Sequence, residues 1–163
     1  MYCREGVKVE DFLLVYGTLD DLDLLVDHRL LMWKEIHPDM TDRVEQSREL
    51  TRKWIASKVS EGSLTSLIVK NSEGRVVGSG CILIKEDQPR PGSSQIRYPY
   101  LLSMYTLPEY RKMGVASSIV KEAIKWSGDN GFGRISLHAS SQGKSVYEKF
   151  GFQQTNEMLL KLS

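Results

Sequence analysis

The stretch from residue 96 to residue 139 limits what this 163-residue chain can fold into more than any other stretch. It opens with an apolar run at residues 101–105 that predicts a central strand. Apolar residues then recur at helical spacing from residue 115 onward, and residues 134–139 have the pattern of a second strand. A strand, a helix and a strand in this order form a right-handed crossover, so we expect the two strands to be parallel neighbours.

The rest of the chain is expected to surround this unit with antiparallel strands and further helices. Turn residues and apolar spacing predict strands at 12–16, 64–70, 75–85 and 96–106, helices at 22–36, 41–60 and 141–150, and one or two closing strands within 152–162. Thr18 and Asp21 are suited to cap the first helix. The order β-α-α-β-β-β-α-β-α-β predicts an α/β fold with a mixed (α+β) sheet, in one domain that spans residues 1–163.

Gly78 and Gly80 leave one face of the predicted 75–85 strand bare. This suits either the close approach of a ligand or a bulge with close helix packing, and the residues favour neither. A second apolar feature is a stripe of large side chains on the two predicted N-terminal helices, at Trp33, Leu50, Trp54 and Ile55. We interpret this stripe as core in preference to a binding platform.

Composition excludes several broad classes of function. Lys and Arg number 22 and Asp and Glu number 21, so a net charge of +1 gives no argument for bulk binding to nucleic acid or to an anionic membrane. No apolar run approaches 18 residues, and the N-terminus has no signal-peptide pattern. Two cysteines without CxxC spacing fit a reducing compartment, so the cytoplasm is the default expectation. The three histidines lack ligand spacing, so we expect no metal.

Residues 107–116 carry chemistry that suits an anion. Arg111 and Lys112 supply positive charge, and Gly114 allows an unusual backbone angle just where the helix begins. A basic helix cap with a glycine is the simpler alternative. The chain has neither a G-x-x-x-x-G-K-[ST] run nor a G-x-G-x-x-G run, and its glycine-rich residues 128–133 suit a helix C-cap.

Two motifs together resemble those of a known enzyme family. Arg111, Gly114 and Ala116 match the R/Q-x-x-G-x-G/A signature of the Gcn5-related N-acetyltransferases, the GNAT superfamily. Tyr147, followed by the Gly-Phe pair at 151 and 152, resembles the second signature, L-Y-x-x-x-G-F. The predicted element order is similar over nearly the whole chain. The resemblance implies a sheet splayed between its fourth strand (96–106) and fifth strand (134–139), with acetyl-coenzyme A in the opening.

The resemblance also implies roles for individual residues. Tyr147 would be the general acid that protonates the leaving thiolate, and the backbone N–H of Met104 would stabilise the thioester oxygen. The backbone of Met104 and Thr106 would hold the pantetheine arm, and the loop would cradle the pyrophosphate. The complete set implied for the cofactor is Met104, Tyr105, Thr106, Arg111, Lys112, Met113, Gly114, Val115, Ala116, Ser117, Ser140 and Tyr147.

The chain departs from the family pattern near Tyr147 and on the fourth strand. Ser140 and Gly143 stand where the family often has Asn and Ala, and Gly143 is a poor residue for a helix interior. The fourth strand lacks the acid that many members use as a base, since Ser103 is its only polar side chain between residues 101 and 104. A base from elsewhere, a water, or an amine that arrives neutral are the alternatives.

Polar residues near the first helix are further candidates. Glu35, His37 and Asp39 would together suit recognition of a cationic amine, although a solvated loop is the simpler interpretation. His28, His37 and His138 are more often structural or surface histidines than bases. Family acceptor pockets are built from variable loops, so the resemblance does not identify the acceptor.

We therefore expect an acetyl-CoA-dependent N-acetyltransferase in which a primary amine attacks the thioester directly. Cys81 has no activating neighbour, so no covalent intermediate is expected. The alternative is a non-catalytic acyl-CoA-binding or sensing module on the same fold, and a phosphate- or nucleotide-binding protein is a third hypothesis. Expected partners are a small-molecule or peptide amine, no nucleic acid and no membrane; a homodimer is an expected assembly, because the family is often dimeric.

Overall fold

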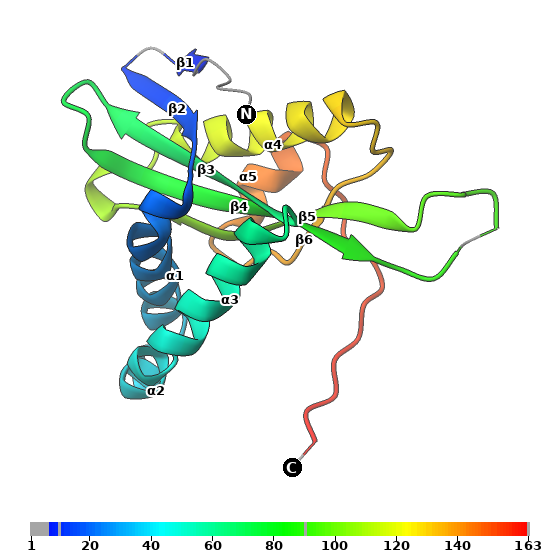
Figure 1. Ribbon diagram of the computed structural model, residues 1–163, viewed down its shortest axis with the longest axis horizontal. Helices are drawn as coiled ribbons and strands as arrows, with labels where there is room; N and C mark the ends of the chain where they lie inside the picture. Colours follow the sequence, from blue (N-terminus) through cyan, green and yellow to red (C-terminus); the bar gives the residue numbers. More distant parts are fainter. Residues whose placement is uncertain (1–6, 10, 90, 163) are drawn as a thin grey trace.

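A mixed sheet forms the centre of the computed structural model, which describes residues 7–9, 11–89 and 91–162. Within these residues the strands lie in chain order, β1-β2-β3-β4-β5-β6 (Figure 1). Neighbours are antiparallel up to β5, and β6 is parallel to β5. The strands are β1 (Val7–Val9), β2 (Phe12–Tyr16), β3 (Leu64–Asn71), β4 (Val76–Glu86), β5 (Arg97–Thr106) and β6 (Ser136–Leu137). The predicted mixed sheet and its parallel pair are confirmed.

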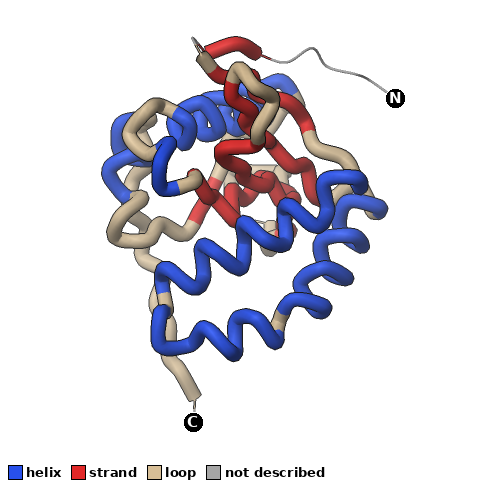
Figure 2. Tube along the Cα trace, turned by 90° about the vertical axis from the view of Figure 1, so that its left-hand side faces the viewer, coloured by secondary structure: helices blue, strands red, loops and turns tan. Residues whose placement is uncertain are grey.

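Helices cover both faces of this sheet (Figure 2). They are α1 (Leu22–Ile36), α2 (Thr41–Gln46), α3 (Arg48–Ser60), α4 (Val115–Asp129) and α5 (Lys144–Lys149). One apolar cluster joins α1 and α3 to the sheet, and a second joins α4 and α5 to the opposite face. Successive side chains of β3 point to opposite faces of the sheet and contribute to both clusters, because Leu67 and Val69 belong to one and Ile68 belongs to the other.

The start of α1 follows the sequence prediction closely. The Thr18 hydroxyl accepts a hydrogen bond from the Asp20 N–H at 3.2 Å, and the Asp21 carboxylate accepts one from the Thr18 N–H at 2.8 Å. These reciprocal bonds satisfy donors that a helix leaves free at its start. They cap a short 3₁₀ turn, Leu19–Asp21, which leads directly into α1.

The predicted 41–60 helix is wrong in its continuity and in its buried stripe. The Ser47 hydroxyl donates to the Val44 carbonyl at 2.6 Å, and this local bond competes with the helical ladder and divides the segment into α2 and α3. Leu50 is 74% exposed, and Trp33 and Trp54 are both 37% exposed. Only Ile55 of the predicted stripe is buried, because α3 turns just one narrow side toward α1 and β3.

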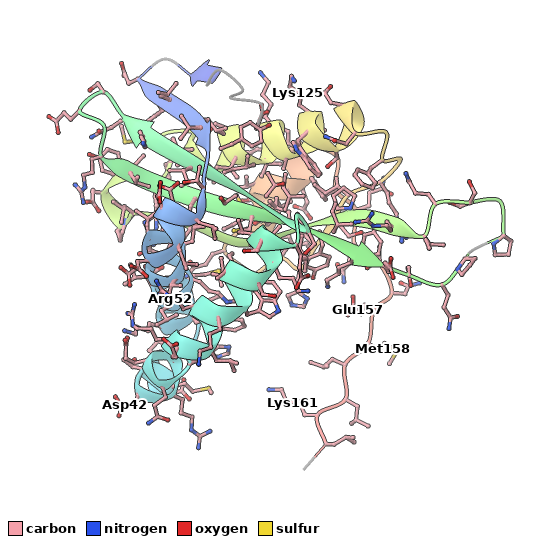
Figure 3. All side chains as sticks on the ribbon, viewed as in Figure 1. Asp42, Arg52, Lys125, Glu157, Met158 and Lys161 are labelled. Atoms are coloured by element: carbon pink, nitrogen blue, oxygen red, sulfur yellow. The ribbon has the colours of Figure 1, made fainter. Side chains whose placement is uncertain are left out.

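The predicted closing strands are also absent from the described residues 153–162, and β6 is shorter than the predicted 134–139 strand. Because β6 has only two residues, it offers a further strand too few backbone N–H and C=O groups to pair with. The tail instead runs away from the body, and Figure 3 shows Glu157, Met158 and Lys161 along it. Its large apolar side chains are between 80% and 94% exposed, namely Met158, Leu159, Leu160 and Leu162.

The bare face of β4 serves helix packing, one of the two interpretations left open by the sequence. A β-carbon added at Gly78 would lie 2.5 Å from Cγ1 of Val115, and one at Gly80 would lie 2.9 Å from Cγ2 of Ile119. Both contacts come from α4, so the glycines let this helix approach the sheet backbone. A register shift between Ser79 and Cys81 also places a bulge here.

We predict that Gly78→Ala lowers the free energy of unfolding by about 1–3 kcal/mol, because the methyl group meets buried Val115 and the Tyr105 carbonyl oxygen, 3.0 Å away. Urea unfolding followed by circular dichroism measures this loss. Gly128→Ala in α4 is the matched control, because no atom lies within 4 Å of the added β-carbon. An equal loss in both variants would contradict the packing role.

Candidate active site

A β-bulge interrupts β5 in the middle of the sheet. Leu102 pairs with Cys81 and Tyr105 pairs with Ser79, so Ser103 and Met104 together oppose the single residue Gly80. Ser103 has a φ of 53°, a conformation that side chains other than glycine rarely adopt. A bulge leaves one residue outside the ladder, so backbone groups at this position are available to another partner.

The sheet opens beside this bulge. β5 pairs with β6 at Tyr100 with Ser136 and at Leu101 with Leu137, and the described pairing ends there. From Leu102 to Thr106, β5 therefore continues without β6. This is the predicted opening between the fourth and fifth strands, and the bulge faces it at the point where the two strands separate.

The loop after β5 turns sharply before α4 begins. Lys112 and Gly114 have φ values of 63° and 89°, and Gly114 forms the N-cap of α4. Such turns make successive backbone N–H groups converge, an arrangement that binds anions. The first N–H groups of α4 lack partners within the helix and lie at the positive end of its dipole. The backbone of this loop is therefore suited to binding an anion, as the place of Gly114 in the sequence indicated.

The Arg111 side chain binds Glu35 on α1, whereas its place in the sequence suggested that it would face a bound anion. Its Nη2 donates to both Glu35 carboxylate oxygens at 2.7 Å, and its Nε donates to the Thr106 carbonyl at 3.1 Å. The Tyr105 hydroxyl donates to the same carboxylate at 3.1 Å, and burial raises the pKa of Tyr105, as does the Glu35 charge. Arg111 therefore ties the loop to α1, and Glu35 is already engaged with it.

The three histidines have different surroundings. His28 is buried, and its Nδ1 lies 2.8 Å from the Ser79 hydroxyl. Burial lowers its pKa, so its imidazole is neutral at pH 7. His37 stacks on the Trp33 ring with 5.5 Å between ring centroids, and His138 is exposed at the edge of a cleft.

Tyr147 lies against the same apolar cluster as Met104. It is 9% exposed, and burial raises the pKa of its hydroxyl. Gly143 precedes α5 as its N-cap, so the predicted cost of glycine inside this helix does not arise. A β-carbon at Gly143 would lie 3.1 Å from Cε2 of Tyr147, so the glycine makes room for the ring. The Ser140 hydroxyl accepts a hydrogen bond from the Gly143 N–H at 3.2 Å.

A cleft of about 1040 Å³ lies between β6, α5 and the start of the tail. Tyr100, His138, Tyr147 and Phe152 are among the residues that line it. Tyr147 is the one predicted cofactor residue in this lining; the bulge and the glycine loop lie outside it. The cleft occupies the side of β6 where the closing strands were expected.

Sequence reasoning missed Arg29 on α1. Its Nη1 donates to the Ser103 hydroxyl at 2.8 Å, so it reaches the bulge itself. A signal for it existed, because Arg29 shares the helical spacing of the apolar residues Leu22, Val26 and Trp33. An arginine within such a stripe is unusual, because charged residues seldom lie on the buried side of a helix.

The described residues contain no group of three or more His, Cys, Asp or Glu side chains that could hold a metal ion. None of the helices in the described ranges is long and apolar enough to cross a membrane.

Comparison with known proteins decides the family. The model of the acetyltransferase (GNAT) family matches residues 29–152, which is most of the chain. The chain belongs to the GNAT acetyltransferase family. The match includes both predicted motifs, together with Arg29, the bulge and Tyr147. No curated protein matches the sequence of this GNAT protein.

Solved structures share the fold of this GNAT protein. A GCN5-related N-acetyltransferase from Ralstonia eutropha is 23% identical, with a TM-score of 0.86 over 93% of this chain and 98% of that one. A predicted acetyltransferase from Clostridium acetobutylicum, solved with acetyl-CoA, is 24% identical, with a TM-score of 0.80 over 93% and 96% of the two chains. Aminoglycoside N-acetyltransferase AAC(6')-Iy, solved with CoA, is 17% identical, with a TM-score of 0.64 over 100% and 99%.

We predict that Tyr147→Phe reduces the loss of stability at alkaline pH. The folded-state pKa of Tyr147 is raised, so the unfolded chain releases this proton first, and stability falls as pH rises above about 10. Urea unfolding at pH 8 and above pH 10 compares the two proteins. Tyr100 and Tyr105 are present in both, so their raised pKa values cancel in the difference. Parallel pH profiles would show that Tyr147 does not contribute.

Proposed function

We propose that this GNAT protein is an acetyl-CoA-dependent N-acetyltransferase that acts on a primary amine. The observation that carries the proposal is the bulge at Ser103 and Met104, which faces the opening between β5 and β6. A bulge there frees a backbone donor at the place where a thioester oxygen would develop negative charge. The proposal treats residues 1–163 as one domain.

The donor site in this proposal runs from the end of β5 to the start of α4. Backbone groups of Met104, Tyr105 and Thr106 would hold the pantetheine arm. Residues 111–117 would hold the pyrophosphate, mostly through backbone N–H groups, since the Arg111 side chain is bound to Glu35. Lys112 is exposed and adds a positive charge to the loop. The acetyl-CoA and CoA found with two of the similar structures support this assignment.

In the proposed reaction the neutral amine attacks the thioester carbonyl directly. A C–N bond forms, the C–S bond breaks, and coenzyme A leaves as a thiolate. Tyr147 donates its hydroxyl proton to that thiolate, and the proton lost by the amine returns through water to Tyr147. A buried hydroxyl with a raised pKa stays protonated at neutral pH, which suits an acid. Cys81 is buried with its pKa raised to about 12, so it is not a nucleophile in this scheme.

A screen of primary amines for thiol release from acetyl-CoA tests the proposal. Acetyl-CoA binding without turnover on any amine would favour the acyl-CoA-binding or sensing module. Binding of ATP or NAD in place of acetyl-CoA would favour the nucleotide-binding alternative.

We predict that Tyr147→Phe lowers kcat on the best amine by about 10²-fold or more and changes the Kd for acetyl-CoA by less than about threefold. The reason is that the variant loses a proton donor and keeps the ring. Assays of thiol release measure kcat, and calorimetric titration measures the Kd for acetyl-CoA. Tyr98→Phe, on β5 with its ring beside Arg134, is the matched control. Unchanged turnover in Tyr147→Phe would remove the acid role.

We predict that Gly114→Ala weakens acetyl-CoA binding by about tenfold and that Gly92→Ala leaves it unchanged. Both glycines have a positive φ, and no described residue has an atom within 4 Å of an added β-carbon, so both variants carry a similar backbone cost of about 1–2 kcal/mol. Only Gly114 lies in the proposed pyrophosphate loop. Calorimetric titration with coenzyme A compares the Kd values of the two variants. Equally weakened binding in both would mean that the substitutions act only by destabilising the fold.

We also propose a homodimer in which the tails are exchanged. Within the described sheet β6 is the edge strand, and the cleft beside it has room for another strand. The same chain carries an extended tail whose large apolar side chains, Met158, Leu159, Leu160 and Leu162, are almost fully exposed. A twofold arrangement would place each tail on the partner's β6 and bury both apolar surfaces.

We predict that the wild-type chain has twice the mass of one chain in light scattering. Replacing Leu159 and Leu160 together with lysine would give a monomer, because two charges cannot be buried at that interface. Leu50→Lys replaces another exposed leucine, on α3, and should leave the dimer intact. A monomeric wild-type chain would contradict the proposal.

The cytoplasm remains the proposed compartment, and the free thiol of Cys81 is compatible with it.

A further inference from the structure

Arg29 is a cation without an anion in the described part of the chain. It is half-buried, and no Asp or Glu of residues 7–9, 11–89 and 91–162 forms an ion pair with it. Several more exposed arginines do pair with carboxylates, namely Arg48, Arg52, Arg75 and Arg111. Proteins usually show the opposite pattern, because a charge that loses water needs a partner more than a solvated one does.

Among the described residues, the guanidinium also keeps most of its donors without a partner. It has five N–H groups, and the hydrogen bond to the Ser103 hydroxyl uses one of them. The Trp33 ring lies on another side, with 5.8 Å between the guanidinium carbon and the ring centroid. Burial lowers the pKa of Arg29, which reflects the cost of holding this charge away from water. An anion from outside the chain would offset that cost.

The position of Arg29 relates it to the proposed chemistry. Ser103 immediately precedes Met104, whose backbone N–H is the proposed thioester donor, and both belong to the bulge. Met104 packs toward α4, whereas Ser103 bonds to α1, so Arg29 lies on the α1 side of the reacting position. The carboxylate of Glu35, farther along α1, is neutralised by Arg111. Of these three side chains, only Arg29 carries a charge that no described carboxylate pairs with.

We propose that Arg29 binds an anionic group of the acceptor, a carboxylate or a phosphate, so that the substrates are amines that also carry a negative charge. This inference rests on the proposed N-acetyltransferase function and names its substrate class. It replaces the cationic-amine hypothesis built on Glu35, His37 and Asp39, because the Glu35 carboxylate is occupied. The guanidinium would hold the anion while the amine reaches the carbonyl beside Met104.

Matched pairs of amines test this substrate class. Free amino acids are compared with their carboxamides, and phosphoethanolamine is compared with ethanolamine, at constant ionic strength and corrected for the fraction of neutral amine. We expect the anionic member of at least one pair to have a kcat/KM at least tenfold higher, chiefly through KM. The pair that shows the preference identifies carboxylate or phosphate. A preference for the uncharged members in the wild-type protein would overturn the proposal.

Substitution of Arg29 separates anion binding from support of the bulge. In Arg29→Gln the preference in kcat/KM for the anionic amine should fall below threefold, and Arg29→Lys should recover part of that preference. Ser103→Ala removes the hydroxyl and keeps the guanidinium, so it should retain the preference. If Arg29 only braces the bulge, Arg29→Gln and Ser103→Ala will lower kcat alike for both members of every pair. Arg52→Gln on α3 is the control for loss of an arginine, and it should behave as wild type.

A binding measurement keeps this test distinct from a failure of the proposed function. If no amine releases thiol, the N-acetyltransferase proposal fails by itself. The Arg29 site is then tested by thermal unfolding with succinate or inorganic phosphate, against chloride at equal ionic strength. A rise in Tm for the wild-type protein that is absent in Arg29→Gln supports an anion site. Equal shifts in both proteins would overturn it.

Discussion

The close packing of α4 on the glycine face of β4 is the contact on which the rest of the site depends. Gly78 and Gly80 let Val115 and Ile119 approach the sheet backbone, so α4 begins directly beside the end of β5. The opposing position Gly80 is also where β5 bulges. A single backbone constraint therefore sets the place of the glycine loop, the start of α4 and the displaced donor at Met104.

Electrostatics on the α1 side then organise what surrounds this backbone. The bidentate pair between Arg111 and Glu35 joins the loop to α1, although each side chain is about 40% exposed and such pairs contribute little to stability. Its main effect is to position the loop against α1 and to engage the Glu35 carboxylate. Arg29 remains as the cation at the bulge, where it gives the proposed acceptor side a positive charge.

Much of the fold followed from local patterns. The bounds of α1, the capping role of Thr18 just before it, the β3–β4 hairpin and the start of α4 after Gly114 were all predicted, because each depends on nearby residues and on a regular period. The two signatures around Gly114 and Tyr147 pointed to the family for the same reason. The errors arose where a distant partner decides the outcome: Leu50 is apolar at helical spacing, yet none of the described elements covers it.

The sequence by itself determined the order of elements from β2 to α5 apart from the break between α2 and α3, the glycine loop, the candidate acid Tyr147 and the family, because these depend on short motifs and periodic side chains. Only the tertiary structure decided which charges meet. Arg111 turned to Glu35 on α1, and Arg29 reached the Ser103 bulge. These partners are separated by many residues or depend on a backbone bulge, and pairing across the fold leaves no periodic signal in the chain.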